Sequence, residues 1–112
     1  MQSSAPVESV APCLERAAFA TSSIPSGGIA LAHLHGCELE PSEISIRGVS
    51  AGFRVEVVSV DHKHHATQLI VVLRLHRVDA RAGEACTVRF WGAGRTCDAS
   101  LTVRHQALAA RG

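Results

Sequence analysis

The chain has 112 residues, of which 11 are basic, 10 are acidic and 7 are histidine, so its formal net charge is +1 with the histidines neutral. This length predicts one domain with a modest core, and an apolar content of 46% excludes a mostly disordered chain. The near-neutral charge excludes a strongly basic nucleic-acid binder. The longest unbroken apolar run, Leu69 to Leu73, has five residues and is too short for a transmembrane segment.

The chain begins with a polar, proline-containing stretch, residues 1–11, which we expect to be a flexible lead-in. It lacks the basic and apolar regions of a signal peptide, so we expect the sequence to start as a mature chain. The composition predicts a single β-rich domain over residues 12–105, followed by a tail over residues 106–112.

The first predicted element is one short helix that starts at Pro12 and ends at Ala20. Pro12 suits a first helical turn, and Leu14, Ala17 and Ala18 fall on one helical face. Residues 21–28 are rich in serine, glycine and proline and predict a loop.

From Ile29 onward apolar and polar residues alternate with a period of two, which predicts strands. Segments 52–60 and 68–77 are expected to form a central hairpin, and residues 92–94 the loop of another. The apolar run within the second segment favours an interior strand covered on both faces. These patterns predict an all-β fold with one short N-terminal helix: a small antiparallel β-sandwich, Ig-like or Greek-key, or a partly open barrel of about six to seven strands.

Four cysteines without a C-x-x-C pair do not match the usual spacing of zinc or redox motifs. We therefore expect two disulfides, Cys13–Cys37 and Cys86–Cys97, in a secreted or periplasmic domain. A three-residue loop at 92–94 would place Cys86 and Cys97 on opposite faces, so this bridge requires a shorter turn or a bulge. The alternative is four buried thiols in a cytosolic protein. Ten arginines against one lysine are typical of a bacterial genome rich in GC.

Histidines form the candidate metal site. His33 and His35 would share one face of a strand with Cα atoms about 6.6–7 Å apart, a spacing that suits Zn²⁺ or Cu²⁺. His62, His64 and His65 crowd one predicted loop and could complete the site if it folds over that strand. The alternative interpretations are solvated loop histidines or a pH-sensitive cluster.

Arginines at the polar positions of several predicted strands suggest a basic sheet face that binds a protein or another anionic surface. Its residues are Arg54, Arg74, His76, Arg89 and Arg104. With no tyrosine and only one tryptophan, Trp91, stacking on nucleic acid or carbohydrate is disfavoured.

No motif of the common catalytic classes occurs in the sequence. We therefore expect a non-enzymatic, monomeric binding module that is secreted or periplasmic. The alternative is a periplasmic Cu- or Zn-binding protein that uses the histidines.

Overall fold

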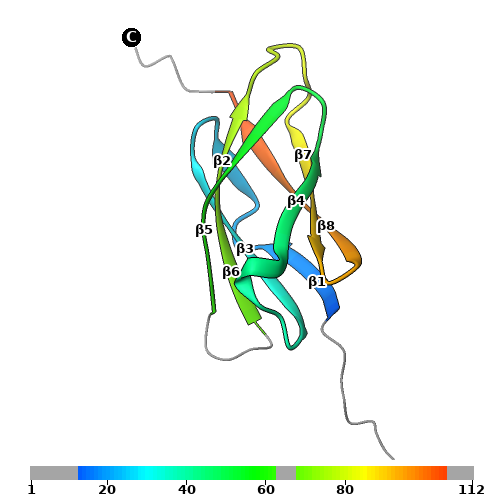
Figure 1. Cartoon of the computed structure of the whole chain (residues 1–112). Helices are drawn as coiled ribbons and strands as arrows, with labels where there is room; N and C mark the ends of the chain where they lie inside the picture. The colour runs from blue at the N-terminus through cyan, green and yellow to red at the C-terminus, as the bar shows by residue number, and fades with distance from the viewer. Residues whose placement is uncertain (1–12, 63–67, 106–112) are drawn as a thin grey trace, which may run out of the picture.

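The computed structural model describes residues 13–62 and 68–105, and within these ranges the secondary structure is almost entirely β (Figure 1). The elements are β1 (Cys13–Phe19), β2 (Ser23–Pro25), β3 (Ile29–Cys37), the 3₁₀ turn η1 (Pro41–Glu43), β4 (Ile44–Val49), β5 (Phe53–His62), β6 (Gln68–Arg77), β7 (Ala85–Gly92) and β8 (Arg95–Arg104). The predicted all-β class is confirmed. No helix in these ranges has the length and apolar character that a bilayer crossing requires.

The strands form two four-stranded sheets. Sheet A has the order β1-β3-β6-β5, and sheet B has the order β2-β8-β7-β4. Neighbouring strands are antiparallel, except that β2 runs parallel to β8. The strands extend along the long dimension of the domain, and the turns gather at its two ends (Figure 1).

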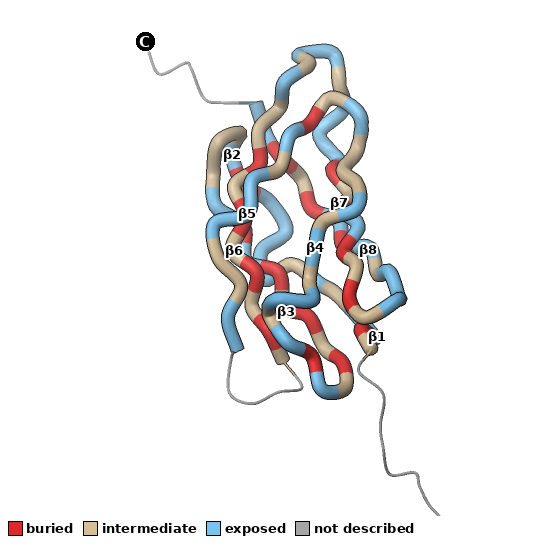
Figure 2. Tube along the Cα trace, viewed as in Figure 1, coloured by how far each residue is buried: buried red, intermediate tan, exposed pale blue. Residues whose placement is uncertain are grey.

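One core fills the space between the two sheets (Figure 2). In sheet A, β3 and β6 bury alternate residues, and β7 does the same in sheet B. Phe19 of sheet A contacts Phe90 of sheet B, with ring centroids 6.2 Å apart. Phe90 is fully buried, so truncating it to alanine would cost about 3–5 kcal/mol of stability.

The predicted N-terminal helix is wrong, because residues 13–19 form strand β1. A β-bulge between Leu14 and Arg16 inserts one extra residue into this strand. The core-facing positions therefore become Leu14, Ala17 and Phe19, with a first spacing of three instead of two. That spacing imitates the periodicity of a helix, although all residues of the strand except Glu15 pair with β3.

The central hairpin is confirmed, since β5 and β6 are antiparallel neighbours. The hairpin between β7 and β8 is tighter than predicted, because Gly92 pairs with Arg95 and leaves only Ala93 and Gly94 in the turn. Their φ angles are 52° and 88°, the positive pair that a type I′ turn requires. Phe90, not Arg89, consequently lies opposite Cys97.

Candidate functional site

His33 and His35 lie on the outer face of sheet A. They alternate along β3 with fully buried Leu34, and both histidines are half-buried. His33 lies opposite Ile70 of β6, and His35 lies opposite Gln68. The predicted placement of both rings on one strand face therefore agrees with the register.

The structure does not bring His62 to this pair. His62 is the last residue of β5 and lies opposite Leu69, a buried residue of the inward-facing row. It therefore occupies the opposite phase of the sheet from His33 and His35. His64 and His65 lie outside the described residues.

The register contradicts the predicted Cys86–Cys97 disulfide. Cys86 lies opposite Leu101, whereas Cys97 lies opposite Phe90. The two cysteines share the inward face but are four residues apart along the ladder, which is about 13 Å. A disulfide requires Cα atoms within about 7 Å of each other. Burial raises the pKa of the Cys86 thiol and keeps it protonated at neutral pH.

Cys13 and Cys37 lie directly opposite each other on β1 and β3. Directly opposed residues of an antiparallel pair have Cα atoms about 4.5–5.5 Å apart, within the range that a disulfide spans. All four cysteines are free thiols in the structure. The Cys13–Cys37 bridge therefore stays a prediction.

Glu15 joins this thiol pair. The Cys37 thiol donates to Glu15 Oε2 over 3.5 Å, and Cys13 Sγ lies 4.0 Å from the same oxygen. This hydrogen bond is the main cause that raises the pKa of the Cys37 thiol, and burial adds to it. Within residues 13–62 and 68–105, one group of three potential metal ligands has donor atoms within 4.8 Å of one another. It consists of Cys13, Glu15 and Cys37.

Gly36 permits this close approach of β1 to β3. A Cβ at position 36 would lie 2.1 Å from the carbonyl oxygen of Cys13 and 3.0 Å from Leu39 Cδ1. The space beside Cys37 is therefore filled by the neighbouring backbone. An open depression next to it is lined by Glu15, Arg16, His35, Gly36 and Cys37.

The predicted basic face is divided between the two sheets. Arg54, Arg74 and His76 belong to β5 and β6 of sheet A, whereas Arg89 and Arg104 belong to β7 and β8 of sheet B. The five residues therefore do not form one stripe, and that prediction is wrong. Alternation along a strand identifies a polar phase but does not reveal which sheet the strand joins.

The outer face of sheet A is apolar at its centre. Leu31 of β3 lies opposite Val72 of β6, and Ile29 and Ile70 lie two residues away on the same face. We call these four residues the apolar block. Ile29 and Leu31 are 41% and 40% exposed, and the side chains of Ile70 and Val72 are half-buried. The sequence predicted a covering on both faces of β6, but the outer face stays partly exposed in the described part of the chain.

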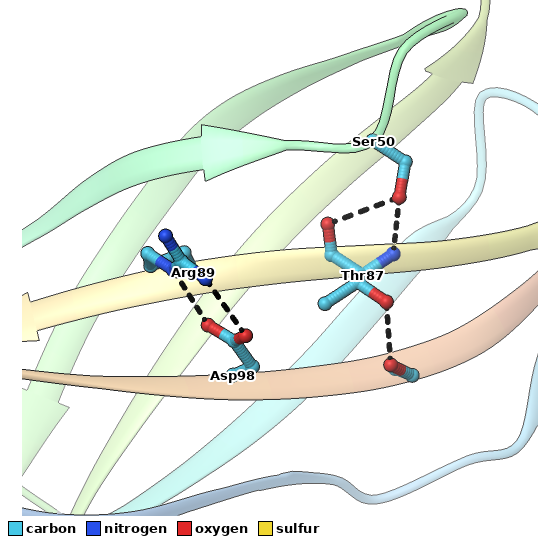
Figure 3. A network of polar contacts seen from close by, with 5 residues as sticks. Ser50, Thr87, Arg89 and Asp98 are labelled. Atoms are coloured by element: carbon cyan, nitrogen blue, oxygen red, sulfur yellow. Dashed lines mark hydrogen bonds and ion pairs between the residues drawn. The ribbon is translucent and has the colours of Figure 1, made fainter.

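The outer face of sheet B is polar and internally bonded (Figure 3). Arg89 holds Asp98 through two hydrogen bonds of 2.9 and 3.2 Å. Ser50 Oγ accepts from the backbone N–H of Thr87, whose hydroxyl contacts Ser100 Oγ at 2.7 Å. A shallow depression of about 240 Å³ lies among these residues.

Trp91 also lies on this face, with the Arg47 guanidinium 4.4 Å from its ring centroid. The polar groups of the face thus mostly satisfy one another. The face has a formal positive surplus, but each guanidinium already has a partner on it: Arg89 bonds Asp98, Arg47 donates to Ser45 Oγ and Arg104 donates to Ser23 Oγ.

Two features of the site escaped the sequence analysis. Glu15 is separated from Cys13 by one residue, a spacing that places both on one face of a strand, but the helical interpretation of the segment concealed it. The apolar block was visible as Ile29 and Leu31 on one strand and the apolar run on another. Their adjacency follows only from the pairing of β3 with β6.

We compared the chain with models of known protein families, with curated proteins and with solved structures, and none of the three comparisons gave a significant match. The geometry of the two sheets therefore carries the functional inference.

Proposed function

We propose that this chain is a non-enzymatic interaction module of a secreted or periplasmic bacterial protein, and that a partner protein binds the outer face of sheet A. The observation that carries the proposal is the apolar block on that face. Outer faces of antiparallel sheets are commonly polar, whereas contiguous exposed apolar residues mark sites of association. Here the two central strands of the sheet are apolar on both sides at the four residues of the apolar block.

The charges at the Ile29 end of the apolar block favour a partner with acidic groups facing that end, whereas Asp61 lies opposite Ile70 at the other end. Next to Ile29, Arg74 lies opposite Glu56, and the following pair is His76 with Arg54. Two arginines against one glutamate leave this end positive with His76 neutral. Among the described residues, the ion pairs are Arg81–Asp79 and Arg89–Asp98, so the charges of Arg54 and Arg74 are not neutralised by an ion pair. Arg74 also donates from Nη1 to the Gly27 carbonyl at 3.0 Å.

The strand order supports an Ig-like topology as part of the proposal. The order β1-β3-β6-β5 corresponds to the A-B-E-D sheet of immunoglobulin constant-type domains, and β4, β7 and β8 correspond to C, F and G. Such sandwiches commonly serve as extracellular binding modules. This argument compares folds and does not compare binding sites. The opposition of Cys13 and Cys37 supports a cross-strand disulfide when the protein is in an oxidising compartment.

Retention of a partner by immobilised protein, compared between surface variants, tests the proposal. A Leu31→Lys substitution places a charge in the centre of the apolar block, and we expect it to reduce retention of a bacterial periplasmic protein about tenfold or more. Thr96→Lys is the matched control, because Thr96 is exposed on the outer face of sheet B. Circular dichroism of both variants is the control for folding, and we expect the spectrum of the wild type from each.

The charged rim is tested in the same assay. We expect Arg54→Ala to weaken retention and to reduce its salt dependence, whereas Arg104→Ala on sheet B leaves both unchanged. Loss of retention in Thr96→Lys but not in Leu31→Lys would contradict the proposal. If the pure protein self-associates and Leu31→Lys abolishes this self-association, the partner is a second copy of the chain and not a different protein.

A further inference from the structure

We propose that Cys13, Glu15 and Cys37 of the reduced protein form a binding site for a thiophilic divalent cation of the Zn²⁺ type. The site lies at the end of β3, beyond the apolar block, and does not depend on the partner proposed above. It exists only while Cys13 and Cys37 are thiols, so the cation site and the cross-strand disulfide of an oxidising compartment exclude each other. It differs in composition from the histidine site that the sequence suggested.

The distances between the donor atoms fit a tetrahedral ion. Zinc lies about 2.3 Å from thiolate sulfur and about 2.0–2.2 Å from carboxylate oxygen, so two ligands of one tetrahedral ion are about 3.8 Å apart for two sulfurs and about 3.5 Å for sulfur and oxygen. Here the two sulfurs lie 3.5 and 4.0 Å from Glu15 Oε2, and all three donors lie within 4.8 Å of one another. Small side-chain rotations therefore suffice to close the three ligands on an ion.

The backbone holds the ligands in place before any ion binds. Cys13 and Cys37 are opposed in a paired ladder, and the bulge at Glu15 leaves its carboxylate beside both sulfurs. Gly36 lets the carbonyl of Cys13 pack against β3 at the position next to Cys37. Three ligands from two paired strands thus need little reordering, which lowers the entropic cost of binding.

The position of Glu15 favours a cation site over a cysteine pair whose only role is to form a disulfide. Its carboxylate is directed at both sulfurs and accepts a hydrogen bond from the Cys37 thiol. A disulfide has no proton to donate, so it would leave Glu15 without this role. A divalent cation replaces the thiol protons and satisfies all three donors at once.

Two other charged or titratable groups lie beside the three ligands. Arg16 and His35 line the same depression and are opposite each other in the ladder. Arg16 offsets part of the negative charge of two thiolates and a carboxylate, and an ion of charge +2 balances most of the remainder. The three residues leave a fourth coordination position of a tetrahedral ion to a water molecule. His35 lines the same depression but does not belong to the group of donors within 4.8 Å of one another.

Titration of the full, reduced chain with Co²⁺ tests the site, because tetrahedral cobalt–thiolate complexes have absorption bands that a spectrophotometer detects. We expect one equivalent of Co²⁺ to produce a thiolate charge-transfer band and to be displaced by Zn²⁺. Cys13→Ser and Cys37→Ser should each abolish the band. Glu15→Gln should weaken binding about tenfold or more while retaining part of the absorption. Cys97→Ser is the matched control and should bind like the wild type.

Three outcomes would overturn the proposal. One is the absence of the band in protein whose four thiols are shown by mass to be reduced. Another is an unchanged band in the variant Cys37→Ser. The third is loss of binding in His64→Ala/His65→Ala with retention in Cys37→Ser, which would return the site to the histidines. Leu31→Lys should bind cobalt normally, so failure of the partner proposal and failure of this one are distinguishable.

Discussion

Gly36 and Cys13 are in such close contact that a side chain at position 36 would begin 2.1 Å from the Cys13 carbonyl oxygen. This contact joins β1 to β3 at the end of sheet A where the thiol pair lies. A Gly36→Ala substitution should therefore force the two strands apart. We expect a loss of about 2 kcal/mol or more in the free energy of unfolding, measured by urea denaturation. Gly83→Ala is the control and should change stability by less than about 0.5 kcal/mol, because an added Cβ there has no neighbour within 4 Å.

The turn between β7 and β8 contains a non-glycine residue in the left-handed region. Ala93 has a φ of 52° and precedes Gly94 with a φ of 88°. Asparagine tolerates this conformation better than alanine, and Asn-Gly is a preferred type I′ sequence. We expect Ala93→Asn to stabilise the protein by about 1 kcal/mol and Gly94→Ala to destabilise it by a similar amount. Thermal unfolding that shifts in the same direction for both variants would contradict the turn assignment.

Arg77 at the end of β6 anchors the segment that leads to β7. Its guanidinium donates to the backbone carbonyls of Ala80, Ala82 and Gly83 at 3.3, 2.7 and 2.6 Å. We expect Arg77→Ala to destabilise the protein by about 2 kcal/mol, since these carbonyls lose a charged donor. Arg77→Lys should recover little of this, because an ammonium cannot reproduce the planar fork. Hydrogen exchange should show faster exchange of the Ala82 amide in both variants, and an unchanged rate would contradict the anchoring role.

Arg89 makes the stability of sheet B sensitive to acid. Hydrogen bonds from its guanidinium lower the pKa of Asp98 below the ordinary value of 3.8. A carboxyl group with a lowered pKa contributes stability above its unfolded pKa and loses it as the pH falls through the folded value. We therefore expect Asp98→Asn to have a lower urea midpoint than the wild type at about pH 5, and the difference to shrink below about pH 3. The effect is small because both side chains are exposed, and a difference that is constant with pH would contradict it.

The strands from β3 onward could be predicted because each carries its own alternation of apolar and polar residues. The strand β1 could not, since its bulge replaces the spacing of two between core residues with a spacing of three. A local pattern that contains one inserted residue is ambiguous between strand and helix. The pairing with β3 resolves the ambiguity, and that pairing is a tertiary contact.

The candidate sites depended on relationships that a single segment does not contain. His33 and His35 were placed correctly on one face, because both belong to one strand. The basic face failed, because Arg74 and Arg89 alternate in the same way but belong to different sheets. Glu15 meets Cys37 only through the register of two strands.

Cys13 lies opposite Cys37 only if residues 13–19 form a strand in this register. Both the assignment of β1 and the cation site therefore depend on this pair. Mild oxidation of the native reduced protein, followed by peptide mapping without reduction, tests it most directly. We predict Cys13–Cys37 as the intramolecular link, with Cys86 remaining a thiol. A link between Cys86 and Cys97, or between Cys13 and any cysteine other than Cys37, would contradict the strand register.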